Sequence, residues 1–321
     1  MALVNLPALG TLVCDFSIGQ VLEEMHSMNA QHDQPIIPQY SLTALNYHQT
    51  KDETPYISGS VKLAASLCYS SVIKVEIDIV KGLGDTDLLG LLLLKNLREL
   101  MIVNPSDNEC QITFDGGIVP VLKAVGGSLN LLKLHGLEMY MNLSAIDYFC
   151  PNLCHVFLEN NLHYTLVQHP EEVSPIETQR PMFKKLETMH LHSSYETLPE
   201  WDHELEVYLQ PLHVISPNIV LLLLSSPVLN YVSIGCCNNL SDDLLQQANN
   251  IHGFENLEQL ELLSCKSLTD KGFDVFMNGN NPLKMITHGG CDLLTAEYLE
   301  ECRKKIDNNN WKVKIEGCLS P

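Results

Sequence analysis

One apolar pattern returns at nearly constant spacing along the C-terminal third of this sequence. Each copy places two large hydrophobic residues three positions apart, a third two positions later, and a small or polar residue three positions after that. The clearest copies are Leu229/Val232/Ile234/Cys237, Leu257/Leu260/Leu262/Cys265, Leu283/Ile286/His288/Cys291 and Val313/Ile315/Cys318. Their cysteines stand 28, 26 and 27 residues apart. A spacing this regular indicates a structural repeat.

A repeat of this length and pattern is typical of a leucine-rich-repeat solenoid. Hydrophobic residues two apart mark a short strand, whose alternate side chains point to opposite faces. We therefore predict an α/β solenoid (a horseshoe) of about eleven repeats, with parallel strands on its concave face and helices on its convex face. Because repeats share one continuous core, we predict a single domain over residues 1–321. The most regular repeats fall in 227–318, and long insertions fall in 162–181 and 195–226.

The hydrophobic positions of the repeat recur further upstream. The earlier copies are Leu9/Leu12/Cys14, Leu42/Leu45/Tyr47, Val72/Val75/Ile77, Leu97/Leu100/Ile102, Leu129/Leu132/Leu134, Leu153/Val156/Leu158 and Leu186/Met189/Leu191. Between strands we predict helices at 17–28, 58–68, 115–125, 241–248, 270–277 and 296–304. Ser241, Thr269 and Thr295 are predicted to cap the last three, since their side-chain oxygens accept from free first-turn amides. Ile219, Leu222 and Leu224 also fit the strand pattern, but too few residues follow them for a repeat, so we predict no strand there.

The balance of charge narrows the class of partner. The chain carries 39 acidic and 19 basic residues, a formal net charge of −20, which argues against nucleic acid or an anionic membrane as partner. Its longest apolar stretches, 88–94 and 219–224, are far shorter than the ~18 residues that a membrane span needs. The chain has eleven cysteines, and most occupy repeat positions that favour a small buried hydrophobe. We therefore expect a reducing compartment, the cytoplasm and/or the nucleus.

The segment from Leu257 to Phe273, Leu-Glu-Gln-Leu-Glu-Leu-Leu-Ser-Cys-Lys-Ser-Leu-Thr-Asp-Lys-Gly-Phe, resembles the cysteine-containing repeats of F-box/leucine-rich-repeat proteins. Cys150-Pro151-Asn152-Leu153 is similar to the link that precedes a strand in that family. The resemblance is strongest over 227–302. It implies substrate recognition for an SCF-type ubiquitin ligase, with a protein substrate held on the concave face.

The F-box itself, a helical segment that grips the Skp1 adaptor in this family, is not found in the sequence. We therefore expect a Skp1-type adaptor as partner only if an F-box precedes these residues, as it would if the chain were a short isoform or an incomplete gene model. We also expect residues 1–16 to meet such a missing segment or a partner. The alternative function is a leucine-rich-repeat scaffold or inhibitor unconnected with ubiquitin.

Candidate binding residues follow from the strand positions that face the concave surface. His135, Glu159 and His192 occupy equivalent positions on three consecutive predicted strands, and parallel pairing sets such positions ~4.8 Å apart. A carboxylate between imidazoles would raise their pKa and make a pH-sensitive contact patch. Zinc binding and a plain solvated polar face are the other interpretations. The full set of predicted protein-binding residues is His135, His155, Phe157, Glu159, His190, His192, Trp201 and Tyr231.

No arrangement in the sequence predicts catalysis or a cofactor. The cysteine spacing follows the repeat, not the short spacing of zinc-ligand pairs, so we interpret these cysteines as core filling. Cys236 is expected on the opposite face, as an accessible thiol. There is no phosphate-binding glycine loop and no nucleophile paired with a base. The sequence therefore predicts a protein-binding module that is not an enzyme, with no bound metal and a metal-dependent activity at the histidine row as the minor alternative.

Overall fold

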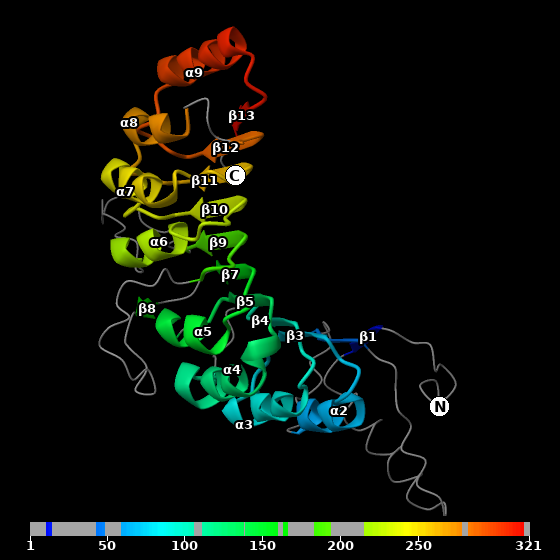
Figure 1. Cartoon of the computed structure of the whole chain (residues 1–321). Helices are drawn as coiled ribbons and strands as arrows, with labels where there is room; N and C mark the ends of the chain where they lie inside the picture. Colours follow the sequence, from blue (N-terminus) through cyan, green and yellow to red (C-terminus); the bar gives the residue numbers. More distant parts are fainter. Residues whose placement is uncertain are drawn as a thin grey trace, which may run out of the picture. The chain divides into compact units, whose positions relative to one another are not determined.

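The computed structural model describes residues 11–14, 43–48, 59–105, 111–137, 139–159, 163–165, 183–193, 215–277 and 282–317. Figure 1 labels their helices and strands. The chain divides into two compact units, Met1–Met139 with Ala145–Leu153 and Tyr140–Ser144 with Cys154–Pro321. Both units have the same plan, in which short parallel strands alternate along the chain with helical segments.

The described part of the first unit has five parallel strands that pair in chain order. They are β1 (Thr11–Cys14), β2 (Ala44–Tyr47), β3 (Lys74–Asp78), β4 (Glu99–Val103) and β5 (Leu131–His135). The register places the repeated hydrophobic positions side by side, so that Val75 pairs with Leu45 and with Leu100. The helical segments are α2 (Ser60–Cys68), α3 (Asp85–Leu88), the 3-10 turns η2 (Leu89–Leu93) and η4 (Gly126–Ser128), the π turn η3 (Phe114–Ile118), α4 (Val119–Val125) and α5 (Leu143–Phe149).

Among its described residues, the second unit has a main set of six parallel strands, again paired in chain order. They are β7 (His155–Glu159), β9 (Thr188–His192), β10 (Tyr231–Gly235), β11 (Gln259–Leu263), β12 (Met285–Gly289) and β13 (Lys314–Gly317). Its helical segments are α6 (Pro217–Leu224), α7 (Asp242–His252), α8 (Asp270–Phe273), the 3-10 turn η5 (Asp274–Phe276) and α9 (Ala296–Asn309). In Figure 1, α6, α7 and α8 lie along one side of strands β9–β11.

Along the strands of both units, buried apolar side chains alternate with less buried side chains, as the repeat predicts. In β4, Leu100 and Ile102 are 0% exposed, whereas Met101 between them is half-buried. In β11, Leu260 and Leu262 are buried and Glu261 is half-buried. Since alternate side chains of a strand point to opposite faces, one face of each strand set packs into the core and the other is left open to solvent.

Several expectations about local structure are confirmed and two are corrected. Residues 217–224 form helix α6, not a strand, and Ser241, Thr269 and Thr295 cap their helices. The stretch expected over 115–125 is helical, but its first part is the π turn η3 in place of α-helix. Pro120 has no N–H to continue the helical ladder, and regular α-helix begins only at Val119.

The second correction concerns the insertion at 162–181. It contains a strand that was not expected, β8 (His163–Thr165), which pairs in parallel with β6 (Tyr140–Asn142) to form a separate two-stranded sheet. The expected helix at 17–28 and most of the insertion at 195–226 lie outside the described residues. The number of repeats therefore stays a prediction.

Carboxylates join successive repeats by a bidentate contact with a threonine. Asp242 Oδ1 accepts from the Thr269 amide at 2.9 Å, and its Oδ2 accepts from the Thr269 hydroxyl at 2.6 Å. The pairs Asp270–Thr295 and Asp85–Thr113 repeat this arrangement. In each pair an acidic residue at a helix start holds the N-cap residue of the helical segment that follows the next strand. Charge-assisted, two-point contacts of this kind are among the stronger hydrogen bonds in proteins.

Glycines make room for these carboxylates. A Cβ on Gly272 would lie 2.4 Å from Asp242 Oδ1, and a Cβ on Gly116 would lie 2.2 Å from Asp85 Oδ2. Both distances are shorter than any ordinary contact, so a side chain there would displace the carboxylate. The carboxylate and the glycine of the following repeat therefore form one structural unit.

Asparagines form a second bridge between repeats, at the positions that precede a strand. The amide of Asn152 donates to the carbonyl of Gly127 at 2.8 Å, and the amide of Asn256 donates to that of Pro227 at 2.8 Å. Asn96 donates to Ser70 in the same way. Each of these asparagines precedes a leucine at 0 or 1% exposure. The Asn-Leu pair thus anchors each repeat to the one before it.

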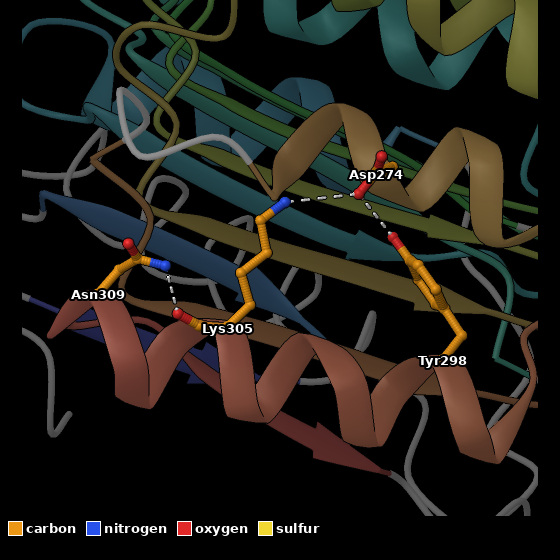
Figure 2. A network of polar contacts seen from close by, with 4 residues as sticks. All are labelled: Asp274, Tyr298, Lys305 and Asn309. Atoms are coloured by element: carbon orange, nitrogen blue, oxygen red, sulfur yellow. Dashed lines mark hydrogen bonds and ion pairs between the residues drawn. The ribbon is translucent and has the colours of Figure 1, made fainter.

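The last helix is held by a polar network on Asp274 (Figure 2). The hydroxyl of Tyr298 donates to Asp274 Oδ1 at 3.1 Å, and Lys305 Nζ lies 3.9 Å from the same oxygen. Within the helix, the Asn309 amide donates to the carbonyl of Lys305 at 2.7 Å. Burial raises the pKa of Tyr298, which keeps the phenol protonated as a donor. An exposed ion pair adds at most about 1 kcal/mol, so these contacts orient α9 more than they stabilise it.

Removal of one carboxylate tests the contact between repeats. We expect Asp242→Ala to lower the free energy of unfolding by about 2–3 kcal/mol, because two hydrogen bonds to a charged group are lost. Asp243→Ala is the matched control, since Asp243 is exposed on the same first turn and is expected to change stability by less than about 0.5 kcal/mol. Urea denaturation measures both, and equal effects would contradict this role for Asp242.

Candidate protein-binding face

The candidate site lies on the open face of strands β7, β9, β10 and β11 in the second unit (Figure 1). Their face positions carry His155, Phe157, Glu159, Thr188, His190, His192, Tyr231, Ser233, Gly235, Gln259, Glu261 and Leu263. The register sets Phe157 beside His190, His190 beside Ser233, and Ser233 beside Glu261. This face therefore brings rings, hydroxyls and carboxylates from four strands together.

Three rings stack in a row across three of these strands. The Phe157 and His190 ring centroids are 4.4 Å apart with planes at 24°, and those of His190 and Tyr231 are 4.9 Å apart at 27°. Tyr231 is not the register partner of His190, so the imidazole leans diagonally across β10. It can do so because its register partner Ser233 is small. All three rings are half-buried, so their edges form an open apolar band.

Beside the ring row runs a continuous chain of hydrogen bonds. His192 Nε2 lies 2.7 Å from Ser233 Oγ, and Ser233 Oγ donates to Glu261 Oε2 at 2.7 Å. The hydroxyl of Tyr231 donates to the same Glu261 oxygen at 3.1 Å. Because the serine proton points to the carboxylate, Ser233 Oγ accepts from His192, which fixes the neutral tautomer of His192 with its proton on Nε2.

The environment shifts the pKa of two residues in this series of hydrogen bonds. Burial lowers the pKa of His192 below its ordinary value, although the carboxylates of Glu159 and Glu261 oppose this. Burial, with the Glu261 carboxylate, raises the pKa of Tyr231 to about 12. The sequence predicted the opposite direction for the histidine, a raised pKa beside Glu159. That prediction is wrong for His192 because the loss of water around the imidazole outweighs the attraction of the two carboxylates.

Gly235 leaves the space that the His192 imidazole occupies. The two residues are register partners, and a Cβ on Gly235 would lie 2.7 Å from His192 Nδ1. Since no side chain fits there, only glycine lets the imidazole lie flat against β10 and reach Ser233. Ser233 itself is 0% exposed, so it acts as an internal bridge beneath the surface groups.

Most of the predicted site residues lie together on the open face of β7, β9 and β10. Phe157, His190 and Tyr231 form the ring row, and Glu159 is the register partner of His192 on the same face. His155 also lies on β7. His135 lies on β5 of the first unit, and Trp201 lies outside the described residues.

Sequence reasoning missed the roles of Ser233, Gly235 and Glu261. The available signal was the pair of small residues at face positions of one strand, opposite two histidines on the strand before it. Small residues at such positions leave space that a longer neighbouring side chain fills, and this argument would have predicted that the imidazoles lean over β10.

The cysteines of the repeat lie in the core. Cys237, Cys265 and Cys291 are 2%, 0% and 7% exposed, and burial raises the pKa of Cys237 to about 11. The thiols of Cys265 and Cys291 donate to carbonyls of the preceding strand, at 3.6 Å to Ile234 and 3.5 Å to Leu262. Cys318 lies outside the described residues. Cys236 is half-buried and has a positive φ of 55°.

Within the described ranges, no group of three or more His, Cys, Asp or Glu side chains is placed to hold a metal ion. Among the same residues, no helix has the length and apolar character that crossing a membrane requires.

Comparison with known proteins gives structural likeness but no sequence match. No protein-family model matches the sequence, and no curated protein matches it. Among solved structures, the chain is similar to one in the crystal structure of the Rad7 and Elc1 complex in yeast, with 15% sequence identity and a TM-score of 0.40 over 90% of this chain and 80% of that one. A likeness this distant does not identify a function.

The depressed pKa of His192 predicts how stability depends on pH. The folded state binds fewer protons than the unfolded state, so the contribution of neutral His192 is complete above its ordinary pKa of 6.5. It is lost as the pH falls below that value. We expect His192→Gln, whose amide can still donate to Ser233, to reduce the fall in unfolding free energy between about pH 7 and pH 5. His155→Gln is the control on the same face, and an unchanged pH profile in His192→Gln would contradict the prediction.

A methyl group at position 235 tests whether the His192 imidazole needs the space beside Gly235. We expect Gly235→Ala to lower the free energy of unfolding by about 1–3 kcal/mol, because it forces His192 away from Ser233. Gly127→Ala is the control, since a Cβ there meets no atom within 4 Å. Thermal unfolding measures both variants. A Gly235→Ala protein as stable as the control would show that the imidazole does not need this space.

Proposed function

We propose that this chain is a leucine-rich-repeat protein-binding module, and that the open face of β7, β9, β10 and β11 contacts its protein partner. The observation that carries the proposal is the row of stacked, half-buried rings of Phe157, His190 and Tyr231. Aromatic side chains that are fixed in place lose little conformational freedom on binding and are enriched in protein interfaces. The chain of hydrogen bonds beside them holds this surface in one arrangement before a partner arrives.

The same geometry favours binding over catalysis. Ser233 is fully buried and donates its proton to Glu261, not to the histidine. A nucleophilic serine needs the reverse arrangement, an exposed hydroxyl that donates to a base. His192, with its proton directed at Ser233, is not placed as that base. We therefore propose a module that is not an enzyme, and its use of cysteines as buried hydrophobes favours the cytoplasm and/or the nucleus.

The more specific proposal is substrate recognition for an SCF-type ubiquitin ligase. It is supported by the resemblance of the repeats over 227–302 to those of F-box/leucine-rich-repeat proteins. Co-purification with a Skp1-type adaptor tests this step. If the full-length product of the transcript does not bind the adaptor, the scaffold or inhibitor function without ubiquitin replaces it, and the binding face is unaffected.

Site-directed photo-crosslinking tests the face itself. We expect a photo-reactive residue at Gln259, which is exposed on β11, to give a discrete crosslinked partner in cells, because it borders the ring row. The matched control is the same residue at Gln247, exposed on helix α7, which should give none. His190→Ala should remove the Gln259 product by breaking the row at its centre. Crosslinking from Gln247 alone, or a product that His190→Ala leaves unchanged, would overturn the proposal.

A further inference from the structure

The ring row ends at Tyr231, where one ring face stacks on His190. His190 on β9 covers one face of Tyr231, and the strand on the other side of β10 is β11. The β11 register partner of Tyr231 is Gln259, which is exposed. Within the described part of the chain, His190 is the one ring or cation that packs on Tyr231. The second face of the tyrosine is therefore not taken by a ring or a cation of the described residues.

A carboxylate oxygen is held at the hydroxyl end of the Tyr231 ring. Glu261 Oε2 accepts from Tyr231 and from Ser233, which fixes the carboxylate at the hydroxyl end of the ring. Its other oxygen, Oε1, has no hydrogen bond to any described residue, and no lysine or arginine among those residues pairs with Glu261. Since Glu261 is half-buried, Oε1 is an available acceptor at a position from which water is partly excluded.

The charges of this face favour a cation. The face positions of β7 and β9–β12 include two carboxylates, Glu159 and Glu261, and neither lysine nor arginine. The whole chain adds a formal net charge of −20, which raises the local concentration of cationic groups. An aromatic face also attracts cations, because its π system is electron-rich. Ring, carboxylate and net charge thus select the same kind of ligand.

Between the two cationic side chains, the geometry selects arginine. A guanidinium is planar, so it can lie flat on a tyrosine face and still donate N–H groups at its edge. A lysine ammonium is a compact point charge that loses more hydration on binding and makes no stacked contact. The Tyr231 hydroxyl bonds directly to Glu261, so the carboxylate lies at the ring edge where such N–H groups would end.

We propose that the Tyr231–Glu261 corner binds an arginine side chain of the partner protein, with the guanidinium stacked on the face of Tyr231 opposite His190 and donating to Glu261 Oε1. This inference rests on the proposed function, since it names the chemistry that the same face recognises. Ser233 is a positioning residue here, because it holds the carboxylate and is itself fully buried.

Peptide pools test the inference on the full-length chain. The probes are heptapeptide pools, random except at the central residue, which is arginine, lysine or citrulline. Citrulline keeps the shape of arginine but has no charge. We expect the arginine pool to bind roughly tenfold more tightly than the citrulline pool, since a stacked and paired guanidinium contributes on the order of 1–2 kcal/mol. The lysine pool should fall between them.

Two isosteric variants locate the binding. Glu261→Gln should bring the arginine pool down to the level of the citrulline pool, because the amide can still accept from Tyr231 and Ser233 but carries no charge. Glu255→Gln makes the same change of charge at an exposed site outside the strands and should leave the preference unchanged. Thermal unfolding of each variant confirms that it is folded. A preference for arginine that survives Glu261→Gln would overturn the inference.

The remaining outcomes separate this inference from the proposed function. If the arginine and citrulline pools bind equally, and His190→Ala abolishes both, the arginine site is wrong while the protein-binding face stands. If His190→Ala leaves binding of every pool unchanged, the face is wrong as well. If the arginine pool does not bind at about 1 mM, a concentration that detects a total binding free energy of about −4 kcal/mol, the arginine site is wrong, and the crosslinking experiment decides the face independently.

Discussion

In-register pairing of short parallel strands is the constraint on which the rest of this structure depends. A single repeat cannot bury its own apolar face. Each strand closes the core by pairing with the strands of the adjacent repeats. The register Leu45–Val75–Leu100 in the first unit and Val232–Leu260–Ile286 in the second puts hydrophobic side chains beside each other at every step. A slip of one residue would turn all of them to solvent, so the hydrophobic pattern fixes the register.

Side-chain contacts reinforce this pairing at both ends of each repeat. Asparagines such as Asn152 and Asn256 bond to a carbonyl of the repeat before, just ahead of a strand. Carboxylates such as Asp85 and Asp242 hold the next N-cap threonine after the strand. Because each contact joins only neighbours, stability is distributed along the chain as a sum of local terms. The same contacts recur with similar geometry in both units, so successive repeats are joined in the same way.

The fixed register also determines what the open face can display. Residues on neighbouring parallel strands stand side by side, so rings and carboxylates from distant segments of the chain form rows. Small residues at Ser233 and Gly235 create space on β10, and the longer imidazoles of His190 and His192 fill it from β9. The resulting surface is held by its own stacking and hydrogen bonds, which reduces the entropy that a partner must overcome on binding.

The parallel α/β plan, the position of nearly every described strand and three helix caps could be predicted from the amino-acid order, because a periodic apolar pattern and local capping chemistry depend on near neighbours. It also placed Phe157, His190, His192 and Tyr231 on a common face. It did not determine the π turn before Val119, the β6–β8 pair, the carboxylate contacts between repeats, or the lowered pKa of His192. Those features depend on which side chain leans toward which neighbour and on how much water is excluded, and only the tertiary structure decides the space left beside each group.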